Sequence, residues 1–123
     1  AEDRSEALRR GAEVAKLMND AGYICICSYM APSAEVRERA RGVVGDDRFF
    51  LVHTDAPLEV CRERDTDGVY ARADSGEFGM FPGVNSVYET PEGADLTLDT
   101  ANEDVDACVN RLVEFLREKN AID

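Results

Sequence analysis

Apolar side chains recur every three or four residues in several stretches of the chain, which is the spacing of an amphipathic helix. The stretch near the carboxyl end shows it most clearly, because its apolar positions fall on one stripe: Val105, Cys108, Val109, Leu112, Val113 and Leu116. The chain is therefore expected to form three long helices, over residues 3–21, 33–44 and 103–119. Two short helices are expected over 57–64 and 69–74.

Residues that favour helix ends support these boundaries. Gly22 is placed to end the first helix, and Ser33 is placed to cap the start of the second. Pro57 suits the first position of a helix, where its missing N–H is not needed. For the last helix the sequence offers two caps, Thr100 and Asn102.

Three short runs between the helices have the composition of β-strands. The runs 23–29 (YICICSY) and 49–54 are almost wholly apolar, as in strands buried on both faces, whereas 94–99 alternates. Strands that alternate with helices predict an α/β fold, with a parallel sheet and helices on both of its faces. We interpret residues 1–123 as a single domain, because no repeat or flexible linker interrupts them.

The segment 75–93 is too rich in glycine and proline for one long element and too long for an ordinary connection. It therefore predicts a functional loop. In α/β sheets, ligands bind beyond the carboxyl ends of the strands. These ends predict a cleft lined by Ser28–Ser33, Thr54, Asp55 and Thr100, which the long loop could cover.

Charge and composition exclude several partners. The 123 residues include 26 acidic and 14 basic side chains, for a formal net charge of −12. So acidic a chain is unsuited to nucleic acid or to an anionic membrane surface, since both attract basic proteins. The sequence has no run of 18 apolar residues and opens on polar residues, so we expect a cytoplasmic protein without a membrane span.

The cysteines give only a weak metal signal. Cys25 and Cys27 would point to the same side of a strand, but no second pair accompanies them and His53 is the one histidine. We therefore expect reduced, buried cysteines and no metal site.

Three longer motifs carry a resemblance. Residues 3–22, DRSEALRRGAEVAKLMNDAG, follow the pattern D-R-x-E-N-I-R-R-x-x-E-V-A-K-L-F-x-D-A-G, and residues 23–41 follow I-C-I-x-S-F-I-S-P-Y-R-x-x-R-x-x-A-R. Residues 53–92 follow V-D-x-P-L-x-V-C-x-x-R-D-x-K-G-L-Y and then R-A-G-E-I-K-G-F-T-G-I-D-x-x-Y-E-x-P. These patterns are those of adenylylsulfate kinases, which the chain resembles from about Asp3 to Ile122.

The resemblance implies a P-loop kinase fold with three layers, α/β/α. It also implies transfer of the ATP γ-phosphoryl group to the 3′-hydroxyl of adenylylsulfate, with Mg²⁺, in sulfate activation. The G-x-x-x-x-G-K-[ST] loop that cradles the phosphates is not among these 123 residues. The chain thus matches roughly the last three-fifths of a family domain, without the P-loop strand, and we expect no catalysis from it alone.

In the family, the P-loop strand lies between the strands that match 23–29 and 49–54. We therefore expect the strands at 23–29 and 49–54 to pair with each other, with another chain, or with an N-terminal part outside this sequence.

Four residues are matched to family positions that bind substrate or ATP; three keep the family side chain, and Met30 replaces an isoleucine. Arg4 matches an arginine that contacts adenylylsulfate, Met30 offers an apolar wall for its purine, and Phe81 matches a phenylalanine that stacks on its base. Arg64 matches an arginine that covers the adenine of ATP. Structural alternatives remain open: Arg4 and Arg64 could be solvated helix residues, and Met30 could pack in a core. No catalytic residue is assigned.

Five substitutions depart from the family pattern: Ala7, Ala31, Asp67, Gly79 and Met80. Ala7 and Ala31 lose polar groups, while Asp67 and Gly79 stand where the family has lysines. Two functions therefore stay open. The chain is part of an active kinase, or it is a degenerate nucleotide-binding module that regulates or scaffolds an ATP sulfurylase as partner or fusion. A homo-oligomer also stays open.

Overall fold

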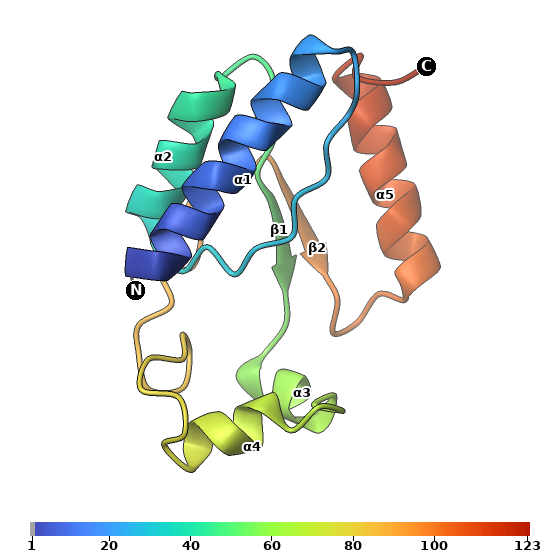
Figure 1. Ribbon diagram of the computed structural model, residues 1–123. Helices are drawn as coiled ribbons and strands as arrows, with labels where there is room; N and C mark the ends of the chain where they lie inside the picture. Colours follow the sequence, from blue (N-terminus) through green and yellow to red (C-terminus); the bar gives the residue numbers. More distant parts are fainter. Residues whose placement is uncertain (1) are drawn as a thin grey trace. The chain divides into compact units, whose positions relative to one another are not determined.

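The computed structural model describes residues 2–123, in which the chain forms five helices and two strands (Figure 1). In chain order they are α1 (Glu2–Asp20), α2 (Ala34–Val44), β1 (Val52–Asp55), α3 (Leu58–Glu63), α4 (Val69–Asp74), β2 (Leu96–Asp99) and α5 (Val105–Glu118). The chain divides into two compact units. Unit 1 contains the residues up to Phe49 together with Ser86–Pro91, and unit 2 contains Phe50–Asn85 together with Glu92–Asp123.

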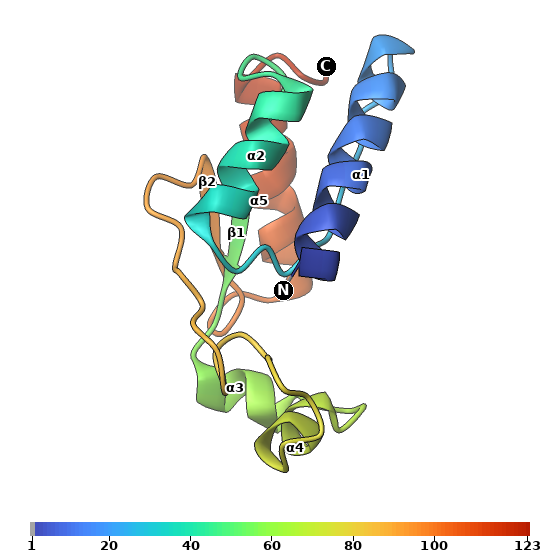
Figure 2. The same ribbon diagram turned by 60° about the vertical axis from the view of Figure 1, so that its left-hand side comes forward.

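In unit 1, α1 and α2 lie side by side (Figures 1 and 2). Small side chains are buried on both helices, namely Ala12 and Ala15 on α1 and Ala40 on α2. Because the distance between packed helices depends on the side chains at the contact, alanines allow a close approach. The predicted cap of α2 is confirmed, since Ser33 Oγ accepts a hydrogen bond from the Val36 N–H at 3.4 Å.

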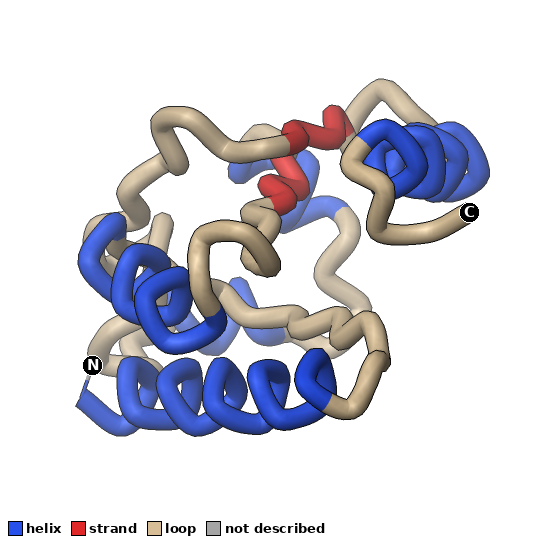
Figure 3. Tube along the Cα trace, turned by 90° about the horizontal axis from the view of Figure 1, so that it is seen from above, coloured by secondary structure: helices blue, strands red, loops and turns tan. Residues whose placement is uncertain are grey.

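After α1 the chain turns at Gly22, whose φ is 89°, and runs back beside α1 without regular secondary structure (Figures 1 and 3). The strand predicted at 23–29 is therefore wrong. A strand exists only through hydrogen bonds to a neighbour, and within residues 2–123 no such bond involves the backbone of 24–30. The expected burial is wrong as well, because Tyr23 is 66% exposed and Ile26 is 79% exposed.

Unit 2 contains the sheet, which among the described residues is a parallel pair of β1 with β2. Val52 is in register with Leu96, and Asp55 is in register with Asp99. The predicted strands 49–54 and 94–99 are thus shorter than expected and pair with each other. Helix α5 packs on β2, and its buried Phe115 meets the ring of Phe50 edge-on at 5.4 Å.

The caps predicted for α5 are also wrong. Asp104 caps this helix instead, with its Oδ1 accepting a hydrogen bond from the Ala107 N–H at 2.8 Å. The two predicted caps serve the turn after β2, because Thr100 Oγ1 donates to the Asp55 carbonyl and Asn102 Nδ2 donates to Asp99 Oδ2. Because α5 begins at Val105, residue 104 stands at the cap position, and Thr100 and Asn102 lie before it.

The parallel pair with its intervening helices confirms the α/β class, although the sheet has two strands rather than three among residues 2–123. All four cysteines are free thiols, but the expected burial is wrong, since Cys27 is exposed and the other three are half-buried. No helix of the described part of the chain is long and apolar enough to cross a membrane.

Candidate functional site

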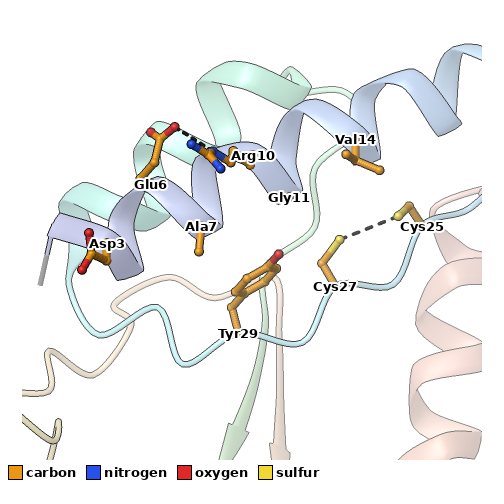
Figure 4. Close-up of a pocket in the computed structure, with 9 residues that line it drawn as sticks. All are labelled: Asp3, Glu6, Ala7, Arg10, Gly11, Val14, Cys25, Cys27 and Tyr29. Atoms are coloured by element: carbon orange, nitrogen blue, oxygen red, sulfur yellow. Dashed lines mark hydrogen bonds and ion pairs between the residues drawn. The ribbon is translucent and has the colours of Figure 1, made fainter.

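An open groove of about 640 Å³ lies in unit 1 between α1 and the extended segment that follows it (Figure 4). The α1 residues on its wall recur at helical spacing, so they share one face: Asp3, Glu6, Ala7, Arg10, Gly11 and Val14. Cys25, Cys27 and Tyr29 form the opposite wall. The two thiols are 3.7 Å apart, Sγ to Sγ.

Glu6 dominates the electrostatics of this groove. Its carboxylate accepts from Arg9 Nε at 2.8 Å and from Arg10 Nε at 3.0 Å. These bonds from Arg9 and Arg10 hold the pKa of Glu6 at about 2, below its ordinary 4.5. The Arg9–Arg10 pair, which matches the R-R of the first motif, is thereby engaged within the helix. With Asp3 and Glu6 negative and Arg10 positive, the groove has no surplus of positive charge to attract a nucleotide anion.

The predicted contacts Arg4 and Met30 both belong to unit 1, but neither lines this groove. Arg4 lies in the first turns of α1 with a half-buried side chain. Met30 is 43% exposed in the loop before α2. An exposed thioether next to a fixed loop can form an apolar wall, whereas simple core packing does not describe this side chain.

The predicted contact Phe81 lies in an aromatic cluster of unit 2. Its ring is 8% exposed and meets Tyr70 edge-on at 5.2 Å and Phe78 at 6.2 Å. Asn85 fixes the surrounding turn, because its Oδ1 accepts from the Phe81 N–H and its Nδ2 donates to the Phe78 carbonyl at 2.7 Å. In this conformation the faces of Phe81 are largely occupied by protein.

Arg64 caps the carboxyl end of α3, and its Nη1 donates to the Thr100 carbonyl at 2.8 Å. The next residue, Asp65, accepts hydrogen bonds from the Val69 and Tyr70 N–H groups at 2.8 and 2.9 Å, which fixes the start of α4. Arg64 and Phe81 thus make separate contacts within unit 2. Asp67 and Met80, which depart from the family pattern, are both exposed.

Three of the residues predicted to line a cleft, Thr54, Asp55 and Thr100, lie at the carboxyl ends of β1 and β2. Thr100 follows β2 and bonds to the Asp55 carbonyl through both its N–H and its hydroxyl at 2.9 Å, so the ends of β1 and β2 are joined. The predicted residues Ser28–Ser33 belong to unit 1. Among residues 2–123, no group of three or more His, Cys, Asp or Glu side chains is arranged to hold a metal ion.

Two features of unit 1 were not predicted. Tyr29 crosses α1 at Gly11, and Glu89 binds the start of α2. The only sequence signal for Glu89 was its place in the Y-E-x-P pattern of the third motif.

Comparisons with known proteins agree with the motifs. The sequence model of the adenylylsulphate kinase family matches residues 1–99. The bifunctional enzyme CysN/CysC of Rhodopirellula baltica is 47% identical over 122 residues, which is 99% of this chain and 19% of that protein. The adenylyl-sulfate kinase of Shewanella pealeana is 43% identical over the whole chain, which spans 60% of that kinase.

A solved structure is similar as well. The APS kinase CysC of Mycobacterium tuberculosis, in complex with AMPPNP and APS, matches with a TM-score of 0.87 and 36% identity. The match covers 95% of this chain and 68% of that one, which confirms the predicted P-loop kinase-like fold class. On these grounds, and on the motifs along its length, the chain belongs to the adenylylsulfate kinase family.

Proposed function

We propose that this chain is the substrate-binding and lid portion of an adenylylsulfate kinase that acts in cytoplasmic sulfate assimilation. In the whole protein, the 3′-hydroxyl oxygen of adenylylsulfate attacks the γ-phosphorus of ATP, the bond from that phosphorus to ADP breaks, and the hydroxyl proton is released. The observation that carries the proposal is the likeness, over 95% of the chain, to a kinase solved with AMPPNP and APS.

The four predicted residues have distinct roles in this proposal. Arg4 binds the phosphate–sulfate anhydride, because a guanidinium combines charge with two parallel donors. Met30 packs against the purine of adenylylsulfate, and Arg64 stacks on the adenine of ATP. Phe81 reaches the adenylyl base once the lid loop turns its ring out of the contact with Tyr70.

The phosphate cradle and the Mg²⁺ site are assigned to no residue of this chain. The G-x-x-x-x-G-K-[ST] motif does not occur in the 123 residues, and the described residues offer no cluster for a metal ion. We therefore propose that this chain alone binds nucleotide without transferring the phosphoryl group.

The substitutions favour a second candidate, a non-catalytic module that binds nucleotide and regulates or scaffolds an ATP sulfurylase. Ala31 has no hydroxyl, and the exposed Asp67 puts a negative charge where the family has a lysine. The bifunctional relatives CysN/CysC and NodQ, 47% and 46% identical, support association with a second enzyme.

Mixing this chain with the N-terminal two-fifths of the Shewanella pealeana kinase separates the two functions. If the chain supplies the substrate side of a kinase, the mixture converts adenylylsulfate and ATP to 3′-phosphoadenylylsulfate, while each part alone does not. Nucleotide binding without turnover in the mixture would instead support the module. Turnover by this chain alone would contradict the assignment of the phosphate cradle to another segment.

Calorimetry with adenylylsulfate tests the binding role directly. Arg4→Met keeps the length of the side chain and removes its charge, so we expect binding about ten-fold to a hundred-fold weaker. Arg117→Met is the matched control, because Arg117 is an exposed arginine of α5 bonded to the Asp123 carbonyl. Equal affinities of the two variants for adenylylsulfate would show that Arg4 does not belong to the binding site.

A further inference from the structure

The loop after Met30 has a backbone conformation that needs support. Ala31 has a φ of 40°, in the left-handed region that residues other than glycine rarely adopt. Such a conformation persists only where the surrounding structure holds it. In this loop the supports are the side chains of Arg37 and Glu89, which lie within the motifs but to which the resemblance assigns no role.

Arg37 holds the loop from within α2. Its side chain is buried, at 6% exposure, and its Nη1 donates to the Ala31 carbonyl at 2.8 Å. Arginine is almost never fully buried unless it is paired. A donor with a formal charge makes a stronger hydrogen bond than a neutral one, so the direction of the Ala31 carbonyl is well fixed.

Glu89 holds the loop from the other side. Its N–H donates to the Pro32 carbonyl at 2.8 Å, and its carboxylate Oε2 accepts from the Ala34 N–H at 2.7 Å. The Ala34 N–H is one of the first donors of α2, which have no partner inside the helix, and a carboxylate is favourable at a helix start. Glu89 thus joins a segment 55 residues further along the chain to the loop of Met30.

We infer that Arg37 and Glu89 are positioning residues, which fix the backbone at Ala31 and Pro32 and so place the Met30 side chain for the adenylyl group of the substrate. The identity of the ligand rests on the proposed function, whereas the clamp itself rests on these contacts. Because Glu89 lies in the segment that completes the long loop 75–93, ordering of that segment and placement of Met30 are coupled.

Methyl-¹³C methionine NMR of the full chain tests the clamp without ligand. The chain has three methionines, and Met30→Leu assigns the signal of Met30. We expect Glu89→Ala to move this signal toward its position in the unfolded chain while that of Met80 stays in place. Glu89→Gln keeps an acceptor for the Ala34 N–H and restores the signal. Glu92→Ala, at another exposed carboxylate, is the control and changes neither signal.

Arg37→Met should move the Met30 signal in the same direction, and Arg37→Lys should partly restore it. Since loss of a buried donor can unfold unit 1, the Glu89→Ala and Glu89→Gln pair decides the test by itself. An unchanged Met30 signal in Glu89→Ala would overturn the inference, and so would a Met80 shift as large as that of Met30.

Calorimetry with adenylylsulfate separates the clamp from the proposed function. If Glu89→Ala lowers the population of the placed loop to a tenth, affinity falls about ten-fold. A Met30 signal that moves in Glu89→Ala, together with no binding to the unsubstituted chain, would keep the clamp and refute the function. If the Met30 signal moves in Glu89→Ala but this variant binds adenylylsulfate as tightly as the unsubstituted chain, the role of Met30 in placing the substrate is refuted.

Discussion

Replacing Gly11 with alanine tests how closely the extended segment lies on α1. A Cβ added at Gly11 would be 2.8 Å from the ring carbon Cζ of Tyr29 and closer still to its hydroxyl oxygen. Cβ atoms in proteins do not come within 3.0 Å of another heavy atom in this way, so the ring must move. It can do so, because Tyr29 is 46% exposed and only the far end of its side chain is in the way.

Two effects then oppose each other. Alanine in a helix interior is more favourable than glycine by about 0.5–1 kcal/mol. Moving the ring away gives up its buried area. Full burial of a large apolar side chain contributes about 1.5–3 kcal/mol, so a ring that is roughly half buried has about 1 kcal/mol at stake. Gly11→Ala should therefore change the free energy of unfolding little, although the helix itself becomes more stable.

A double-mutant cycle with Tyr29→Ala, measured by urea unfolding, isolates the contact. Without the ring, Gly11→Ala should stabilise the chain by about 0.5–1 kcal/mol, so the coupling between the two positions should be about 1 kcal/mol. Gly42→Ala in α2 is the matched control, because an added Cβ there meets nothing within 4 Å and its effect should not depend on Tyr29. Additivity within about 0.3 kcal/mol at Gly11 and Tyr29 would refute the close approach.

Two further predictions concern carboxylates. Because the pKa of Glu6 is lowered to about 2, this group stabilises the fold above pH 4.5 and the effect is lost as the pH falls through 2. The melting temperature of Glu6→Gln should therefore lie below that of the unsubstituted chain at pH 7 and match it near pH 2. A difference in melting temperature that stays constant with pH would contradict this. Asp65→Ala removes the acceptor for the Val69 and Tyr70 N–H groups, so α4 should lose about 0.5–2 kcal/mol of local stability. Amide exchange at Tyr70 measures this loss, with the neighbouring Asp67→Ala as the control that leaves exchange unchanged.

Periodicity predicted the helices well because a helix bonds within itself. Helix α4 has the bounds that the sequence predicts, α1 differs from prediction by one residue at each end, and α2 differs by one residue at its start. The cap of α5 was missed because the helix begins two residues later than predicted, at Val105, so residue 104 stands at the cap position. Thr100 has the right chemistry for a cap but lies too far before this start. Its hydroxyl donates instead to the Asp55 carbonyl, 45 positions away, a contact that local preference cannot show.

The candidate site could be predicted only through the resemblance. Spacing and composition gave no reason to prefer Arg4 or Phe81 over other arginines and phenylalanines, and their roles came from matching motifs. The contacts that shape the Met30 loop were beyond sequence reasoning, since the bond from Ala34 to Glu89 spans 55 residues. The periods of helices and strands relate residues only a few positions apart, so they cannot predict a contact at that separation.

The exposed segment 24–30 shows why a strand is harder to predict than a helix. Its apolar residues, among them Ile24, Ile26 and Tyr29, have the composition of a buried strand, yet within residues 2–123 nothing bonds to its backbone. Burial of Ile26 alone, which is 79% exposed, would contribute about 1.5–3 kcal/mol. Pairing with a neighbouring strand would bury such side chains. We therefore expect the segment to pair when a strand is supplied, either by a second copy or by a segment outside this sequence.

Hydrogen exchange measures that pairing residue by residue. In the isolated chain, the amides of 24–30 should exchange almost as fast as in an unfolded peptide, while those of α1 are protected. Adding the N-terminal two-fifths of the Shewanella pealeana kinase, or raising the chain concentration, should protect alternate amides of this segment, because a strand bonds on each edge through every second residue. Protection in the dilute chain alone would show that these residues already have a partner. A catalytically active mixture in which 24–30 stays unprotected would show that function does not require the strand.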